Sequence, residues 1–232
     1  HTRSVASVPA PPRRDHEPDD NDMHTLTLPA NIHSSSVKGI ILVEICDIRV
    51  CQAILKLDLP TVTVDMPREY RDLFGKIDIV TMENKSHIQR LTQELIKRGF
   101  QRFAFAGDLC SSNVGSGFQE RYDALCDTLK EHRLNLDLEC SLLTETDQQL
   151  MNSNYLVNRI KKMKHLPDIF ICGNDWTAIQ IMHAAQFLGY IIPKDFSIMG
   201  FDNIAESEHT FPPLTTISTP KEQLGIAAAT CI

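Results

Sequence analysis

One acidic residue of this chain stands directly after a short apolar strand pattern. Residues 197–201 read Ser-Ile-Met-Gly-Phe, and Asp202 and Asn203 follow them. In open α/β sheets, ligands bind in the crevice beyond the carboxyl ends of the strands. A carboxylate at that place can accept hydrogen bonds from a polar ligand. The pattern therefore predicts that Asp202 binds a ligand, and the alternative is that Asp202 is an ordinary turn residue.

The chain carries no residue pattern typical of an enzyme active site. Gly115-Ser116-Gly117 opens a helical segment as a dinucleotide-binding loop would, but Glu120 occupies the third glycine position, where its charge would repel a pyrophosphate. A nucleophile elbow, a phosphate-binding loop, a zinc-protease motif and clustered metal-ligand spacings are all missing, and the nine histidines are scattered. We therefore expect no catalytic residue, no cofactor, no metal site and no enzymatic activity.

Composition limits the class of protein. The chain has 232 residues, of which 42% are hydrophobic and 23% are charged, as in a globular domain. A formal net charge of −7 argues against a nucleic-acid-binding module within these residues. No apolar run approaches the roughly 18 residues of a membrane span, and residues 1–33 lack the apolar region of a secretory signal. We expect no membrane partner.

Cysteine usage points to a reducing compartment. The chain has seven cysteines, an odd number, and none of them forms a C-x-x-C pair. Several lie inside strand or helix patterns, as Cys172 does. Buried free thiols in the cytoplasm are therefore favoured over a disulfide framework.

Apolar periodicity predicts a doubly wound α/β fold. Residues 1–36 are rich in proline and acidic residues and predict a poorly ordered tail or linker. After them, apolar runs of strand length alternate with stretches of helical spacing, which indicates a parallel sheet. The predicted strands are Gly39–Val43, Thr61–Val64, Ile77–Thr81, Arg102–Ala106, Asp168–Cys172 and Phe196–Gly200, and the predicted helices carry apolar stripes at 88–96, 125–129, 156–163 and 179–188.

Several motifs resemble one family of bacterial regulators. The segment Gly200-Phe201-Asp202-Asn203 followed by Pro212-Pro213-Leu214-Thr215-Thr216 is similar to the effector-binding core of LacI/GalR-type transcription regulators. The resemblance extends over roughly 37–229. The other motifs that carry it are Val37–Leu42, Leu59–Asp65, Val80–Asn84, Arg121–Leu125 and Pro167–Asp175.

The resemblance implies two lobes of the type I periplasmic-binding-protein fold, with the first lobe incomplete. Residues 37–82 and 217–232 would form the first lobe in part, and residues 83–216 the second. The crossings near 80–83 and 217–219 would be the moving parts of a hinge closure. The family's helix-turn-helix is absent from this chain.

The resemblance also implies four ligand contacts. Arg121 would present a planar fork of donors, Asp202 would accept hydrogen bonds from vicinal hydroxyls, and Asn174 would both donate and accept. Asp65 would contribute from the first lobe. Each residue has a structural alternative: Arg121 could be a solvated surface residue, and Asn174 could simply cap the following helix.

The implied function is effector sensing in a cytoplasmic repressor. A sugar, a sugar phosphate or a purine would bind between the lobes of a homodimer and change its affinity for operator DNA. The alternative is a periplasmic sugar-binding protein of a transporter, which shares the two-lobed fold. The cysteines and the closeness of 201–216 to the repressor branch favour the regulator.

Overall fold

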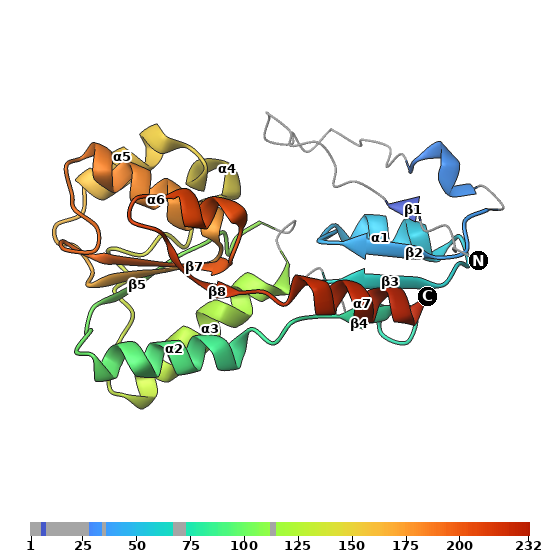
Figure 1. Ribbon diagram of the computed structural model, residues 1–232, viewed down its shortest axis with the longest axis horizontal. Coiled ribbons are helices and arrows are strands. Elements are labelled where there is room, and N and C mark those ends of the chain that lie inside the picture. The colour runs from blue at the N-terminus through green and yellow to red at the C-terminus, as the bar shows by residue number, and fades with distance from the viewer. Residues whose placement is uncertain (1–5, 8–27, 34–35, 67–72, 112–114) are drawn as a thin grey trace. The chain divides into compact units, whose positions relative to one another are not determined.

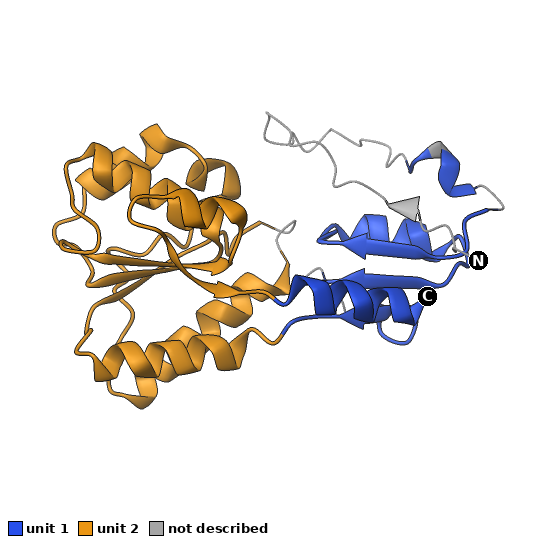
Figure 2. Ribbon diagram, in the orientation of Figure 1, with its two compact units in different colours: residues 1–82, 220–232 blue, residues 83–219 orange. Residues whose placement is uncertain are grey.

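The chain folds into two compact units. The computed structural model describes residues 6–7, 28–33, 36–66, 73–111 and 115–232. The first unit comprises residues 1–82 and 220–232, and the second comprises residues 83–219 (Figure 2). Within the described residues, each unit holds a four-stranded sheet whose strands are all parallel. The predicted α/β fold with two parallel-sheet lobes is confirmed.

The sheet of the first unit is covered by a helix on each face (Figure 1). Ile40 and Leu42 are completely buried against α1, whereas Ile41 between them packs on the opposite side with α7. This alternation follows from the two-residue period of side chains along a strand. The elements, with the strands in sheet order, are β1 (Ala6–Ser7), β2 (Ile40–Val43), β3 (Thr61–Val64), β4 (Asp78–Val80), α1 (Ile48–Leu55), α7 (Lys221–Cys231) and the 3₁₀ helix η1 (Ala30–His33).

Part of the segment predicted as a tail is built into the first unit. β1 pairs with β2, and Ile32 of η1 is buried in the same apolar cluster as α1. Residues 1–5, 8–27 and 34–35 lie outside the described residues. At the other boundary, residues 217–219 belong to the second unit, where the sequence assigned them to the first. The reason is that β8 (Thr215–Ser218) stays paired with β7 as far as Ser218.

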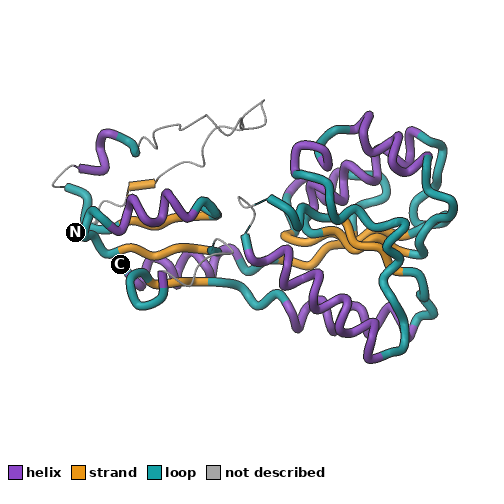
Figure 3. Tube along the Cα trace, turned by 180° about the vertical axis from the view of Figure 1, so that it is seen from behind, coloured by secondary structure: helices purple, strands orange, loops and turns teal. Residues whose placement is uncertain are grey.

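The second unit has helices on both faces of its sheet (Figures 1 and 3). α2 and α3 pack together on one face, and α4, α5 and α6 cover the other. None of the helices among the described residues is long and apolar enough to cross a membrane. The elements, with the strands in sheet order, are β5 (Phe103–Ala106), β6 (Ile169–Cys172), β7 (Ser197–Asp202), β8, α2 (Lys85–Lys97), α3 (Ser116–Glu131), α4 (Asp147–Leu150), α5 (Ser153–Lys161), α6 (Asp175–Phe187) and the 3₁₀ helix η3 (Ala205–His209).

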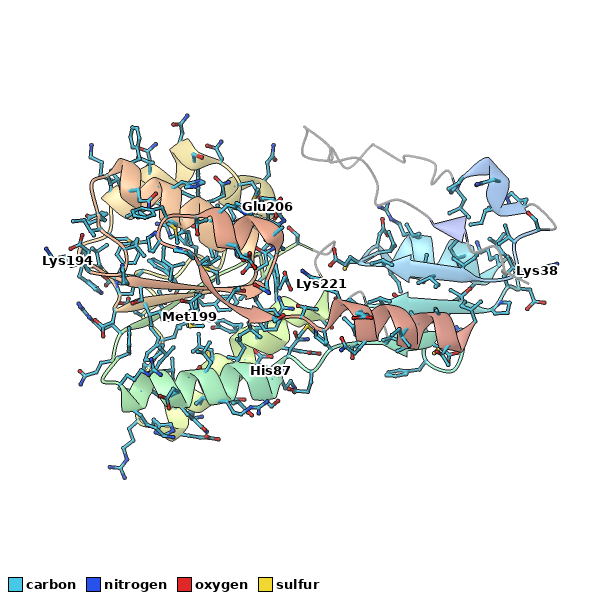
Figure 4. The ribbon with its side chains drawn as sticks, viewed as in Figure 1. Lys38, His87, Lys194, Met199, Glu206 and Lys221 are labelled. Carbon is cyan, nitrogen blue, oxygen red and sulfur yellow. The ribbon has the colours of Figure 1, made fainter. Side chains whose placement is uncertain are left out.

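β7 lies inside the sheet, between β6 and β8, and its two faces pack against different helices. Ile198 packs in the apolar cluster on the α6 side, while Met199 lies on the side of α2 and α3 (Figure 4). Gly200 again faces α6, and a Cβ at this position would lie 2.0 Å from Oδ1 of Asp175. Asp175 is fully buried, and it accepts hydrogen bonds from the Ile204 backbone N–H at 2.9 Å and the Thr216 hydroxyl at 2.6 Å. Only glycine fits beside this anchored carboxylate.

We predict that Gly200→Ala lowers the free energy of unfolding of the second unit by about 1–3 kcal/mol, the usual cost of overpacking. The added methyl group forces Asp175 away from its hydrogen-bond donors. The measurement is urea unfolding followed by the fluorescence of Trp176, the chain's single tryptophan, which is in the second unit. Gly117→Ala is the control, because a Cβ there meets its nearest atom at 3.5 Å. Equal midpoints for the two variants would contradict the assigned packing.

Candidate ligand-binding site

The carboxyl ends of β6 and β7 form one edge of the second sheet. Asp202 is the last residue of β7, and Gly173 and Asn174 follow the last residue of β6. The two strands are hydrogen-bonded neighbours in parallel register, with Ile171 opposite Met199. Residues that follow the two strands therefore lie at the same edge, where ligands bind in open α/β sheets.

Arg121 of α3 extends its side chain to this edge and is buried, with 6% of the residue exposed. Its Nη1 donates to the carbonyl oxygen of Gly173, and its Nη2 lies 3.9 Å from Oδ1 of Asp202. The guanidinium carbon lies 3.5 Å from the ring centroid of Phe201, within the range of a cation–π contact. The alternative of a solvated surface arginine is therefore wrong.

Asn84 makes a hydrogen bond with Nε of the same guanidinium. Its Oδ1 accepts from Nε of Arg121 at 3.0 Å, and its Nδ2 donates to Glu120 at 2.9 Å. Asn84 occupies the N-cap position of α2 without making a side-chain cap bond. Glu83 caps instead, accepting from the backbone N–H of Ser86 at 2.9 Å. The amide of Asn84 is thereby available to orient Arg121.

The carboxylate of Glu83 is stabilised in its charged form. The Ser86 hydroxyl, followed by the backbone N–H groups of Ser86 and Lys85, donates to it and holds its pKa below the usual value. A negative charge in this place also interacts favourably with the amino end of α2. The start of α2, and with it the position of Asn84, is fixed by these bonds.

The backbone at Asp202 is held in a conformation that L-residues rarely adopt. Its φ is 107°, and φ of the following Asn203 is 50°. Strained backbone of this kind is concentrated at ligand and switch sites. The hydroxyl of Thr219 donates to Oδ1 of Asp202 at 3.1 Å, and about a third of the Asp202 side chain is exposed. The carboxylate is thus fixed in place and still accessible.

The other two predicted residues are placed at strand ends as well. Asn174 is the N-cap of α6, and its Oδ1 accepts from the backbone N–H of Thr177 at 2.9 Å, so the capping alternative is realised. Asp65 follows β3 in the first unit, with φ of 61° and its N–H donating to the carbonyl oxygen of Val80 at 2.9 Å. The structure brings Arg121 and Asp202 together, and ligand contact by all four residues stays a prediction.

The sequence reasoning missed two neighbours that orient the arginine. Asn84 lies in the motif Val80–Asn84 and Phe201 at the end of a predicted strand, and neither was predicted to orient Arg121. The signal for Phe201 is its parity in β7, since it points to the side opposite Gly200 and therefore toward α3. Asn84 carries no comparable sequence signal, because its role depends on Glu83 taking over the cap.

The arrangement can bind a polar ligand with donors and acceptors. The guanidinium offers N–H donors in a fixed plane, and the carboxylate accepts hydrogen bonds from hydroxyl or amine groups. Arg121 and Asp202 together carry no net charge, and the nearby Glu120 adds a negative one. The composition of the site therefore favours a neutral hydroxyl-rich ligand over an anionic one.

The chain matches one protein family model and is similar to known transcriptional regulators. The family model for a periplasmic binding protein-like domain matches residues 92–232. The HTH-type transcriptional repressor PurR of Serratia proteamaculans is 30% identical over 138 residues, which cover 60% of this chain and 39% of that repressor. The chain thus spans about two fifths of the length of this curated relative.

Solved structures show the same fold. The structure of the transcriptional regulator LacI from Bacillus cereus subsp. cytotoxis superposes with a TM-score of 0.70 at 25% identity, covering 84% of this chain and 67% of the other. The periplasmic binding protein/LacI transcriptional regulator from Alkaliphilus metalliredigens, complexed with D-xylulofuranose, gives a TM-score of 0.64 at 21% identity, covering 86% and 69%.

These matches confirm the predicted resemblance to LacI/GalR-type regulators and the partial type I periplasmic-binding-protein fold. The relatives carry the names of transcriptional regulators, not of enzymes. They also favour the regulator over the transporter component, which was the alternative from sequence.

We predict that Arg121→Ala destabilises the second unit by about 1–3 kcal/mol, because the buried acceptors on Asn84 and Gly173 lose their donor. Arg98→Ala is the matched control, since Arg98 pairs with Glu94 on the surface and its loss should cost no more than about 0.5 kcal/mol. Urea unfolding followed by Trp176 fluorescence measures both. If the two variants unfold at the same midpoint, Arg121 is not anchored as described.

Proposed function

The chain belongs to the periplasmic binding protein-like domain family, and on this premise we propose that it is the effector-sensing part of a transcriptional repressor. The observation that carries the proposal is the Arg121–Asp202 pair at the carboxyl edge of the second sheet, with Nη2 and Oδ1 3.9 Å apart. The pair places the planar guanidinium of Arg121, which donates hydrogen bonds, beside the accessible carboxylate of Asp202, which accepts them. The proposed function is therefore ligand binding.

The proposed ligand is a neutral sugar or nucleoside. Its hydroxyl groups would donate to Asp202 and accept from Arg121, with Asn174 and Asp65 as further contacts. Each hydrogen bond to a charged group contributes roughly 1.5–3 kcal/mol net. A few of them reach about −8 kcal/mol, which corresponds to micromolar affinity. A sugar phosphate is disfavoured, because the site's own charges already sum to zero or below.

The proposed regulatory mechanism uses the two crossings of the chain between its units. These crossings lie at Met82–Glu83 and Thr219–Pro220. Effector binding would favour one arrangement of the units in a cytoplasmic homodimer. A helix-turn-helix on each protomer would then bind a palindromic operator with altered affinity. A coupling of about 1–3 kcal/mol changes operator affinity five- to 150-fold.

We predict that Asp202→Asn weakens effector binding at least about tenfold, a loss of about 1.4 kcal/mol. The amide keeps the shape of the carboxylate but loses the charge and one acceptor. A thermal-shift panel of neutral sugars, nucleosides and sugar phosphates first finds the ligand, and titration of Trp176 fluorescence then measures affinity.

Asp168→Asn is the matched control for this titration. Asp168 also pairs with an arginine, Arg102, at 2.9 Å, but at the amino end of β6 in the same sheet. Its replacement should leave affinity unchanged. If both variants bind the effector as tightly as the unaltered chain, the site assignment is wrong. In the complete regulator with its helix-turn-helix, operator affinity should differ with and without the effector. Equal operator affinity in both conditions would refute the proposed function.

A further inference from the structure

Three side chains of different donor type converge at the end of the second unit opposite the Arg121 site. They are Asp137, Cys140 and His165, and their ligand atoms all lie within 4.8 Å of one another. Asp137 is fixed beside the first residue of β5, since its N–H donates to the carbonyl oxygen of Phe103 at 2.8 Å. His165 lies in the loop that leads into β6. The cluster therefore lies at the amino ends of β5 and β6.

The turn that carries Asp137 and Cys140 is held in place by hydrogen bonds. Oδ1 of Asp137 accepts from the backbone N–H of Cys140 at 3.1 Å. The hydroxyl of Ser141 donates to the carbonyl oxygen of Asp137 at 2.7 Å and accepts from the N–H of Phe105 at 3.1 Å. These bonds tie the turn to β5. Two residues separate Asp137 from Cys140, the same spacing that the paired cysteines of many zinc sites use.

His165 completes the cluster from a second segment. Its Nε2 makes a hydrogen bond of 2.7 Å to Oδ2 of Asp137, and its backbone carbonyl oxygen accepts from the Cys140 thiol at 3.2 Å. Cys140 is buried, with 1% exposed, whereas 39% of the His165 side chain is exposed. The cluster thus has a buried sulfur on its inner side and an imidazole facing solvent, which leaves an approach for an ion from outside.

From this convergence we propose that Asp137, Cys140 and His165 bind one Zn²⁺ ion. Thiolate, imidazole and carboxylate are the ligands that zinc takes in proteins, and three protein ligands with a water molecule in the fourth position form an open tetrahedral site. Tetrahedral ligands at zinc bond lengths lie about 3.5 Å apart. The 2.7 Å between Nε2 of His165 and Oδ2 of Asp137 therefore has to lengthen by roughly 1 Å, and Sγ of Cys140, which lies within 4.8 Å of both, has to take up the same separation.

Binding is balanced in charge and protons. The Cys140 thiol gives up its hydrogen bond to the His165 carbonyl oxygen and releases its proton to solvent as the Sγ–Zn bond forms. The hydrogen bond between Nε2 of His165 and Oδ2 of Asp137 breaks, the Nε2 proton leaves to solvent and Nδ1 takes one up, so the neutral imidazole and the carboxylate can each donate a lone pair. The divalent ion is then neutralised by one thiolate and one carboxylate, which suits a half-buried place. Oδ1 of Asp137 keeps its bond from the Cys140 N–H, and this bond orients the carboxylate from outside the coordination sphere.

The test measures zinc binding by the full, reduced chain. A chromophoric chelator competes with the chain for Zn²⁺ and reports the affinity. We expect one equivalent of Zn²⁺ bound at the cluster and an affinity that falls at least about 100-fold in His165→Ala. The side chain of His165 is partly exposed, so its removal spares the core. His132→Ala, an exposed histidine at the end of α3, is the matched control and should bind as before. Absence of any bound zinc, or equal affinity in His165→Ala and the unaltered chain, overturns the proposal.

Cobalt identifies the sulfur ligand. Co²⁺ in place of zinc should give a thiolate-to-cobalt charge-transfer band that Cys110→Ser keeps and Cys140→Ser loses. Because Cys140 is buried, Asp137→Asn serves as a second variant, with weakened binding expected and folding checked by thermal unfolding without metal. A band lost with Cys110, which is exposed, or unchanged binding in Asp137→Asn, overturns the assignment. Effector affinity is measured in a separate experiment. A chain that binds no zinc would therefore leave the proposed function unaffected.

Discussion

Burial of the Arg121 guanidinium is the constraint on which the carboxyl edge of the second sheet depends. A buried charge is tolerated only when its donors are satisfied, and here the partners come from three elements: Asn84 from the start of α2, Gly173 after β6 and Asp202 at the end of β7. The Phe201 ring adds a cation–π face. One side chain therefore fixes the positions of a helix start and two strand ends relative to one another.

A second buried side chain, that of Asp175, stabilises the same edge from the other face of the sheet. Asp175 ties the start of α6 to Ile204 and to Thr216 of β8, and it occupies the space beside Gly200. The end of β7 thus lies between Asp175 on one face and the Arg121 guanidinium on the other, and Asp175 also holds β8 through Thr216. The opposite end of the sheet carries the Asp137, Cys140 and His165 cluster, so the two candidate sites share a scaffold but no ligand atom.

Sequence reasoning recovered what depends on periodicity and motif, and it missed what depends on long-range pairing. The runs of β2, β3, β4, β5, β6 and β7 were all predicted within about two residues, since strands of a covered parallel sheet tend to be continuous apolar runs. β8 was not among the predicted strands, because its Thr-Thr-Ile-Ser run has no continuous apolar pattern, and its last two residues fell in the crossing predicted at 217–219. Arg121 and Asp202 were found through the motif, whereas the role of Asn84 and the approach of His165 to Asp137 require the folded chain.

The hydrogen bond from Thr219 to Asp202 joins a proposed ligand-binding residue to the chain segment that leaves the second unit. Thr219 is the last residue of the second unit, and Asn84, which orients Arg121, is the second residue after the other crossing. A ligand that takes Oδ1 of Asp202 competes with the Thr219 hydroxyl for the same lone pairs. In the proposed function, a ligand and the Thr219 hydroxyl would compete for the same acceptor oxygen, and the torsional freedom at Thr219–Pro220 would then depend on ligand concentration.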